Sequence, residues 1–265
     1  MKGISHGKKL GLKNLTIPQP GAQNQWFWDE VNMSGLTPLL TSVYENISHE
    51  FVCAMIERWH EETNSFHLPI GEMTITLDDV ACLLGILVTW RLLPDRELTC
   101  DEGLKMIQME LIFTTEAAAM EMTKHGAAHI SFGVLKRRYE EVLNRCNQLL
   151  EPDTLEEEDE RAQVRLACIK AFLLLLLGWT IFFDKNSKNI NLLWLLALQD
   201  MDELDNWSWR GMRLAFLYEQ LSLTSDSSVA SCDGYMTLLV VIFVFLLFYL
   251  LDCKCIVVCI ILVLI

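Results

Sequence analysis

The chain has 265 residues, of which 52% are hydrophobic and 21% are charged. Its 35 acidic residues outnumber its 21 basic residues, which gives a net charge of −14. The apolar content excludes a disordered chain, and the negative charge argues against direct nucleic-acid binding, which needs clustered Lys and Arg. The nine cysteines are scattered and odd in number, so neither a disulfide framework nor a zinc site is indicated.

The first predicted elements are a leader and one helix. Residues 1–35 begin with a stretch rich in Gly, Pro, Asn and Lys, and we expect a flexible leader there. A helix is predicted from Ser48, a capping residue, to about Glu62, with one apolar face that includes Val52, Met55 and Trp59.

A short extended piece and three further helices follow. Pro69 and Gly71 exclude a helix, and the alternation of residues 73–76 predicts one short extended element near residues 69–76. Thr76 is placed as the N-cap of the next helix, with Asp79 completing a capping box and Gly85 ending the helix. Helices are then expected at residues 101–123 and 130–150, the second with an inward face of Phe132, Leu135, Tyr139, Val142 and Leu143.

An acidic segment divides the chain. Residues 151–160 hold seven acidic residues and no basic one, so residues 151–164 are predicted to be a solvated linker inside one domain. The alternative is a docking surface for a basic partner. Residues 165–177 are predicted to be a core helix, too short to span a bilayer, with an extended exit at 180–183 and helices at 192–204 and 209–221.

The C-terminal region is strongly apolar. After a Ser/Asp-rich linker at 223–235, residues 236–265 are apolar apart from Thr237, Asp252 and Lys254. Two interpretations stay open. The segment is a hydrophobic helix that anchors the chain in a membrane, because a span needs about 20 residues, or it is a read-through segment that is never inserted.

Several motifs in this chain resemble those of the plant mobile domain, a family also labelled aminotransferase-like and found in maintenance-of-meristems and MAIN-like proteins. The first motif runs from Glu57-Arg-Trp59 through Phe66-His-Leu-Pro-x-Gly-Glu72 to Leu84-Gly85. A leucine-rich run ends at Gly178, and a tryptophan-led helix follows. The matching positions are Trp59, Phe66, His67, Leu68, Pro69, Gly71, Glu72, Thr76, Leu77, Asp79, Val80, Gly85, Gly178, Asp184, Lys185, Trp209, Gly211 and Tyr218.

The resemblance covers residues 36–222. Because the family domain ordinarily continues beyond the tryptophan-led helix, we expect a truncated copy. The resemblance implies a nuclear plant protein without established catalysis, linked to transposon silencing, gene regulation and meristem maintenance. It also implies protein partners, among them a serine/threonine phosphatase, whose own metallophosphatase motifs this sequence lacks.

Residues with chemical potential have simpler structural interpretations. His67 near Glu72 and Asp79 suggests acid–base catalysis, but local hydrogen bonding is favoured. The basic strip at residues 136–138 with Arg145 is expected to pair with neighbouring glutamates rather than to bind nucleic acid. The tryptophans are expected in the core, and the family motif is expected to build the fold. No lysine lies in a pyridoxal-phosphate context.

These observations predict a mostly α-helical, irregular multi-helix domain with one short extended or hairpin element and a C-terminal hydrophobic helix. We expect a non-enzymatic nuclear interaction module with no cofactor, no metal and no direct nucleic-acid contact. The alternatives are a tail-anchored membrane protein, held through residues 236–265, and an enzyme with an unrecognised site.

Overall fold

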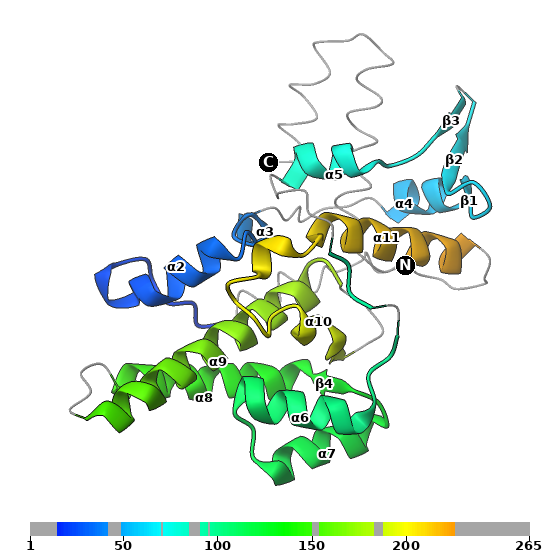
Figure 1. Cartoon of the computed structure of the whole chain (residues 1–265). Coiled ribbons are helices and arrows are strands. Elements are labelled where there is room, and N and C mark those ends of the chain that lie inside the picture. Colours follow the sequence, from blue (N-terminus) through cyan, green and yellow to red (C-terminus); the bar gives the residue numbers. More distant parts are fainter. Residues whose placement is uncertain are drawn as a thin grey trace.

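The computed structural model describes residues 15–41, 49–69, 71–84, 91–94, 96–149, 154–182 and 188–225. Within these ranges the chain is mostly helical with two small antiparallel sheets, which confirms the predicted fold class (Figure 1). The first elements are a 3-10 turn η1 (Ala22–Asn24), α2 (Gln25–Met33), α3 (Pro38–Thr41), α4 (His49–Ile56), β1 (Trp59–His60), β2 (Ser65–Leu68), β3 (Gly71–Met73) and α5 (Leu77–Leu84). The remaining elements are α6 (Cys100–Leu111), α7 (Thr115–His125), β4 (His129–Ser131), α8 (Phe132–Gln148), α9 (Leu155–Trp179), β5 (Asn189–Asn191), α10 (Leu193–Leu196), a 3-10 turn η2 (Leu204–Asn206) and α11 (Trp209–Ser225).

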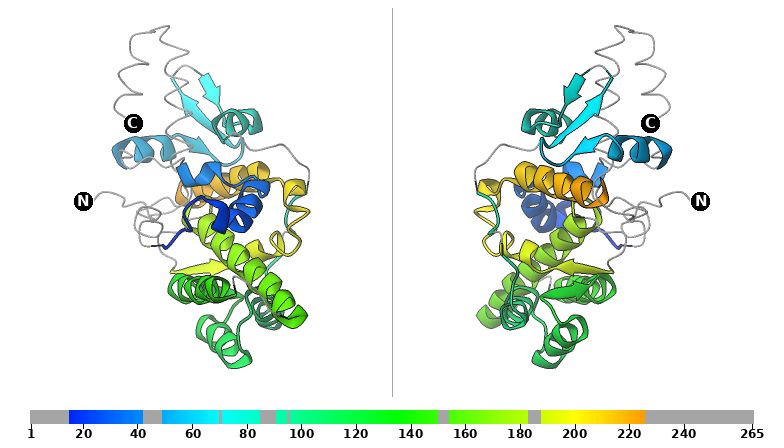
Figure 2. Two further views of the ribbon diagram at one scale, coloured as in Figure 1. Left: turned by 90° about the vertical axis from the view of Figure 1, so that its left-hand side faces the viewer. Right: turned by 90° about the vertical axis from the view of Figure 1, so that its right-hand side faces the viewer.

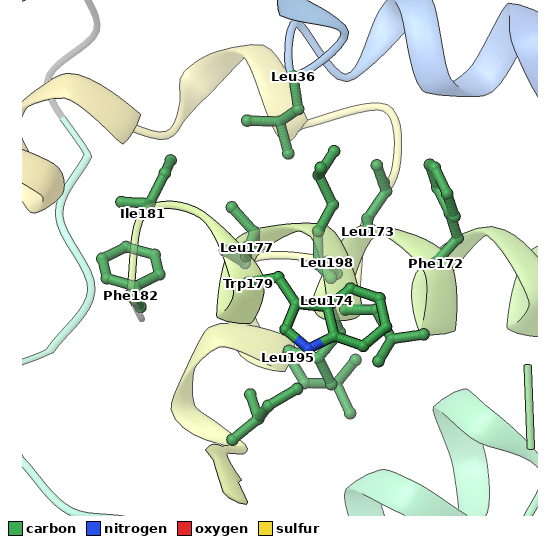
Figure 3. Packing of buried hydrophobic residues seen from close by; sticks show 14 of the residues in the cluster. Leu36, Phe172, Leu173, Leu174, Leu177, Trp179, Ile181, Phe182, Leu195 and Leu198 are labelled. Atoms are coloured by element: carbon green, nitrogen blue, oxygen red, sulfur yellow. The ribbon is translucent and has the colours of Figure 1, made fainter. Parts of the chain in front are cut away.

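Helix α9 runs through the middle of the molecule. Its C-terminal half, from Ala167 to Trp179, is buried on every side, as expected of a helix that is apolar all round. Helices α2, α6, α8 and α10 pack against it. Figure 3 shows its leucines meeting Leu36 from the N-terminal region and Leu195 and Leu198 from the chain around α10. Each buried leucine contributes about 1.5–3 kcal/mol, so this helix organises the core.

The acidic segment is not the linker that we predicted, because residues 155–164 form the first turns of α9. Thr154 caps the helix by accepting a hydrogen bond from the Glu157 N–H at 3.2 Å. The acidic residues that follow lie at the positive end of the helix dipole, which stabilises them there. Helix α9 is therefore 25 residues long, about twice the predicted length. Gly178 lies inside it rather than ending it.

Among the described residues, one helix, α9, is long enough and apolar enough to cross a membrane. However, 78% of its most apolar 18-residue segment is buried within the protein. The predicted interpretation of its apolar part as a core helix is therefore confirmed.

A lower layer of α6, α7 and the β4–β5 sheet packs on α8 and α9 (Figure 1). We predicted one helix over residues 101–123, but two are present. Ile112 adopts the left-handed conformation, with φ of 54°, and ends α6. Thr114 then caps α7 by accepting the Ala117 N–H at 3.3 Å. The β4–β5 sheet, which joins residues 129–131 to 189–191, was not predicted.

An upper layer of α4, β1–β3 and α5 lies along α11 (Figures 1 and 2). The predicted extended element is present as strands β2 and β3 of a three-stranded sheet. Helix α4 ends at Ile56, earlier than predicted, because Trp59 pairs with Phe66 in the β1–β2 ladder. Helix α10 is also shorter than the predicted helix over residues 192–204.

The segment around α2 is packed, so the predicted flexible leader is wrong for this part. Phe27 and Val31 of α2 are fully buried, and the Phe27 ring meets the ring of Phe172 of α9 edge-on at 5.0 Å. The Tyr139 hydroxyl of α8 donates to the Thr16 carbonyl at 2.8 Å. These aromatic residues anchor the N-terminal segment to the α8–α9 pair.

Several predicted features lie outside the described residues. These are residues 1–14 of the leader, the Ser48 cap, Gly85, Asp184, Lys185, and residues 226–265, which hold the apolar tail and most of the predicted linker. The predicted helix over residues 209–221 is present as α11, which extends to Ser225 and so includes the first residues assigned to that linker.

Replacing Gly178 by alanine should lower the free energy of unfolding by about 1–3 kcal/mol through overpacking. A Cβ at this position would lie 2.9 Å from Ile190 Cδ1 and 3.1 Å from Phe132 Cε1. Gly133→Ala in α8 is the matched control, since a Cβ at this position meets nothing within 4 Å. The control substitution should stabilise the helix by about 0.5–1 kcal/mol. Urea unfolding measures both, and equal effects would contradict the close packing at Gly178.

Candidate functional site

The family-like motif forms the β2–β3 hairpin and the start of α5. In the hairpin, Phe66 pairs with Met73 and Leu68 pairs with Gly71. Gly71 has a φ of 133°, a conformation that favours glycine. Phe66 is buried and His67 points to solvent, as the alternation of a strand requires.

The predicted capping box at the start of α5 is confirmed. Thr76 Oγ1 accepts the Asp79 N–H at 3.2 Å, and the Asp79 carboxylate accepts the Thr76 N–H at 2.8 Å. The shorter Asp thus replaces the Glu that usually occupies this position. Val80, one residue later, is fully buried, so the box directs the apolar side of α5 inward.

Helix α11, the last element of the described chain, contacts this motif. The Tyr218 hydroxyl donates to the Ile75 carbonyl at 2.5 Å and lies 2.7 Å from Thr74 Oγ1. The Trp59 ring meets the Phe66 ring edge-on and the Tyr218 ring at a tilt, with centroid distances of 4.8 and 5.0 Å. Its indole N–H donates to Ser222 Oγ at 3.0 Å. The first and last parts of the resemblance therefore meet in one aromatic cluster.

A polar group lies on the exposed side of the same hairpin. The His60 and His67 rings stack at 3.6 Å, and His67 Nε2 lies 3.3 Å from Glu72 Oε1. Ser65 Oγ donates to the same carboxylate oxygen at 2.5 Å. Hydrogen bonds from Ser65, then Thr63 and His67, hold the pKa of Glu72 below its usual value.

This arrangement differs from a nucleophilic triad, in which a histidine takes the proton of a serine. Here Ser65 donates to the carboxylate and His67 contacts the same oxygen, so neither side chain activates the other. The local bonding expected for His67 agrees with this geometry, although Asp79 belongs to the capping box instead. Within the described residues, no group of three or more His, Cys, Asp or Glu is placed to hold a metal ion.

A second polar cluster, which the sequence analysis missed, lies between α7, β4 and β5. The buried Glu121 carboxylate accepts hydrogen bonds from the Ser131 N–H at 2.9 Å and from the Ser131 hydroxyl at 2.8 Å. Lys124 Nζ and His125 Nε2 lie 2.7 and 3.1 Å from Ser131 Oγ, and Asn189 Nδ2 lies 3.1 Å from His125 Nδ1. The only sequence signal was a Glu and a His four residues apart, which face the same side of a helix.

The electrostatics of this cluster favour a charged carboxylate. Burial alone would raise the pKa of Glu121, but the hydrogen bonds from Ser131 and the charges of Lys124 and His125 bring that pKa below its usual value. Burial lowers the pKa of the neighbouring His129, and the charge of His125 lowers it further. The hydrogen bonds of this cluster join α7, β4 and β5.

Another buried charge lies in the leucine-rich part of α9. Lys170 Nζ donates to Glu110 Oε2 of α6 at 2.6 Å and to the Gln199 carbonyl at 2.8 Å. The Lys170 side chain is 3% exposed, and burying such a charge is tolerated only when it is paired and hydrogen-bonded. A lone lysine in an apolar run was the visible signal, but its partner could not be read from the sequence.

Two residues of the basic strip pair within their own helix, as predicted. Lys136 pairs with Glu140 at 3.7 Å and Arg138 with Glu141 at 3.2 Å, both within α8. Arg145 instead reaches across to Glu160 of α9 at 2.7 Å. Arg145 therefore links α8 to α9.

The remaining motif residues that the structure describes lie at buried positions, helix ends and turns. Trp209 is buried, and its indole N–H donates to the Leu204 carbonyl at 3.3 Å. Gly211 lies close to Ser208, whose hydroxyl accepts its N–H at 3.3 Å. Pro69 and Leu77 are exposed, the first in the turn after β2 and the second in the first turn of α5. The predicted tryptophan positions, Trp26, Trp28, Trp59, Trp194, Trp207 and Trp209, are all buried or packed against the core.

Comparison with known proteins gives one family. A family model described as "Plant mobile domain" matches residues 38–246, which extends past residue 222 and into the apolar tail. Protein MAIN-LIKE 1 of Arabidopsis thaliana is 30% identical over 194 residues, which are 73% of this chain and 35% of that protein. Protein MAINTENANCE OF MERISTEMS of the same species is 27% identical over 194 residues, 73% of this chain and 36% of that protein.

A third relative carries an enzyme name. Serine/threonine-protein phosphatase 7 long form homolog of Arabidopsis thaliana is 29% identical over 217 residues, which are 77% of this chain and 14% of that protein. The matched region thus spans little more than a third of these relatives at most. No solved structure matches the chain.

Thr76→Ala should lower the free energy of unfolding by about 0.5–2 kcal/mol, because the α5 N-terminus loses its capping hydroxyl. Asp78→Asn is the control, since Asp78 also lies in the first turn of α5. This substitution removes only a charge that interacts favourably with the helix dipole, worth about 0.3–1 kcal/mol. Thermal unfolding of both variants checks this. An unchanged melting temperature for Thr76→Ala would reject the role of the cap.

Acidification should destabilise the protein through the Glu121 cluster. The folded-state pKa values of both Glu121 and His129 are lowered. Their stabilising contributions are therefore complete above the unfolded pKa, about 4.5 for Glu and 6.5 for His, and are lost as the pH falls through the folded pKa. The unfolding free energy, measured against pH, should show a shallower decline below about pH 4.5 in Glu121→Gln. Glu116→Gln, on the same helix, should keep the decline of the parent chain.

Proposed function

Since the chain belongs to the plant mobile domain family, we propose that it is a non-enzymatic interaction module that acts in nuclear gene regulation, transposon silencing or meristem maintenance. The observation that supports this proposal is the family match over residues 38–246, together with relatives named for meristem maintenance. Several of the family residues contribute to packing, capping or turns, and we propose that exposed side chains of the domain carry recognition.

The internal hydrogen bonding of the polar clusters supports a role without catalysis. Ser65 and Ser131 both donate to carboxylates, at 2.5 and 2.8 Å. Both serines are buried, so neither hydroxyl is accessible to a substrate in solution. The stacking of His60 on His67 is equally suited to stabilising the hairpin.

A serine/threonine phosphatase is the partner that we propose. The phosphatase 7 long form homolog shares this domain. One protein that is named as a phosphatase therefore contains a region similar to this chain. For this chain we propose that the association occurs between separate chains. Co-precipitation of the purified full chain with that phosphatase tests this, with an unrelated phosphatase as control. If the chain does not bind the phosphatase, the proposed partner is wrong, but the proposed nuclear role is unaffected.

The second candidate is a tail-anchored membrane protein. The apolar composition of residues 236–265 favours it, because the segment is long enough for a span of about 20 residues. The family match runs to residue 246, however, and so assigns the first part of this segment to the domain itself. That assignment favours the nuclear candidate.

Localisation in plant cells separates the two candidates. We expect a fluorescent fusion of the full chain to enter the nucleus and to remain extractable by alkaline carbonate. A fusion that lacks residues 247–265 but keeps the whole family match is the matched control, and it should behave in the same way. A full chain that resists carbonate extraction and lies on the endoplasmic reticulum, with release on truncation, would overturn the nuclear proposal.

A further inference from the structure

Two cysteines face each other across the packed α8–α9 pair. Cys146 of α8 and Cys168 of α9 are free thiols, 2% and 0% exposed. Tyr139 and Cys146 lie on one side of α8, since their spacing of seven residues is two helical turns. Cys168 and Phe172, four residues apart, lie on one side of α9. Since the Tyr139 and Phe172 rings are 5.8 Å apart, both thiols lie in the interface between the helices.

The two thiols are also at a similar level along the helices. The helices are antiparallel, because Arg145 near the end of α8 pairs with Glu160 near the start of α9. Starting from the Tyr139–Phe172 contact, Cys146 lies about 10 Å along α8 and Cys168 about 6 Å along α9 in the same direction. The Cys168 thiol accordingly donates a hydrogen bond to the Cys146 sulfur.

The surroundings of this thiol pair make its two sulfurs unequal. The hydrogen bond from Cys168, and then the charge of Arg165, hold the pKa of Cys146 below its usual value although burial opposes them. Donating that hydrogen bond, and then burial, raises the pKa of Cys168. Cys146 is therefore the sulfur that carries the thiolate, which is the reactive form of a cysteine.

Arg165 is placed to stabilise that thiolate. Its guanidinium carbon lies 4.9 Å from the centre of the Trp26 ring. Its Nε is buried and, within the described part of the chain, has no hydrogen-bond partner. A buried donor without an acceptor is costly, and an anion at Cys146 offsets that cost.

The thiol pair lies close to the surface. Cys146 is in the last turn of α8, which ends at Gln148, and terminal turns open more easily than the middle of a helix. Arg165 and Trp26 are only partly buried. The site therefore excludes a large substrate but admits hydrogen peroxide, which is little larger than water.

We propose that Cys146 and Cys168 are a redox pair that hydrogen peroxide converts into a disulfide between α8 and α9. The Cys146 thiolate attacks one peroxide oxygen, the O–O bond breaks, and Cys146 becomes a sulfenic acid. The other oxygen leaves as hydroxide and takes up the proton that Cys146 had released, which gives water. This proposal is independent of the proposed nuclear role.

The second step closes the disulfide. The Cys168 sulfur attacks the Cys146 sulfur, the S–O bond breaks, and the hydroxyl leaves with the Cys168 proton as a second water. One peroxide is thus reduced to two waters while two thiols are oxidised. Two molecules of reduced glutathione reverse the link by thiol–disulfide exchange and leave as oxidised glutathione.

Peroxide treatment of the reduced full chain, followed by thiol blocking and mass spectrometry, tests the proposal. Cys53 and Cys100 are internal controls, because both are free and more exposed than the pair. We expect a Cys146–Cys168 disulfide to form faster than either control is oxidised, and reduced glutathione should restore both thiols. Faster oxidation of a control, or a link from either sulfur to any other cysteine, would overturn the proposal.

Single substitutions separate the roles of the two sulfurs. In Cys168→Ala, Cys146 should stop at the sulfenic acid, which dimedone traps as an adduct. In Cys146→Ala, Cys168 should remain a thiol. Cys100→Ala is the control and should form the disulfide at the rate of the parent chain. Dimedone labelling of Cys168 instead of Cys146 would show that the proposed order of attack is wrong.

Substitution of Arg165 tests how the thiolate is stabilised. Arg165→Gln should slow disulfide formation several-fold and move its pH profile to higher pH, because Cys146 loses the neighbouring cation. Arg165→Lys keeps the charge and should recover part of the rate. Arg137→Gln is the matched control, since Arg137 is exposed on α8 and its loss changes the net charge equally. An equal slowing in the control would exclude the role of Arg165.

Discussion

Burial of the leucine-rich half of α9 is the constraint on which the rest of the fold depends. A helix that is apolar on every side must be surrounded, and helices α2, α6, α8 and α10 provide that surrounding from distant parts of the sequence. Gly178 allows Ile190 of β5 and Phe132 of α8 to approach the helix backbone closely. The small β4–β5 sheet and the packed N-terminal segment are therefore consequences of covering α9.

The same helix shows why length and hydropathy alone do not identify a membrane span. Its length and composition satisfy the requirement, yet Lys170 lies within the apolar run. In a bilayer an unpaired lysine is costly, whereas here Glu110 and the Gln199 carbonyl satisfy its charge and its hydrogen bonds. The buried ion pair also fixes how α6 and the chain after α10 dock, because either partner without the other would cost about 3–5 kcal/mol.

The predictable parts of this structure were local. The Thr76 cap follows from neighbouring residues, and so do the extended element near Pro69, the inward face of α8 and the two ion pairs within that helix.

The predictions failed in two ways, where local signals were absent or misleading and where contacts join distant residues. Ile112 adopts a left-handed conformation that β-branched residues rarely take, so no local signal divided α6 from α7. The acidic start of α9 resembles a solvated linker until Thr154 is known to cap it. Long-range pairs such as Glu121 with Ser131 and Lys170 with Glu110 depend on the tertiary arrangement.

The aromatic cluster of Trp59, Phe66 and Tyr218 shows how residues of the family motif connect distant parts of the fold. Trp59 and Ser222 are 163 residues apart and share a hydrogen bond, so the β1–β3 sheet and α11 hold each other in position. The motif is therefore a set of long-range contacts that close the domain. A substitution of a buried member of the motif, such as Trp59 or Phe66, is therefore expected to change stability. Specificity for a partner must come from side chains that closure leaves exposed, and these are the positions at which members of one fold family are free to differ.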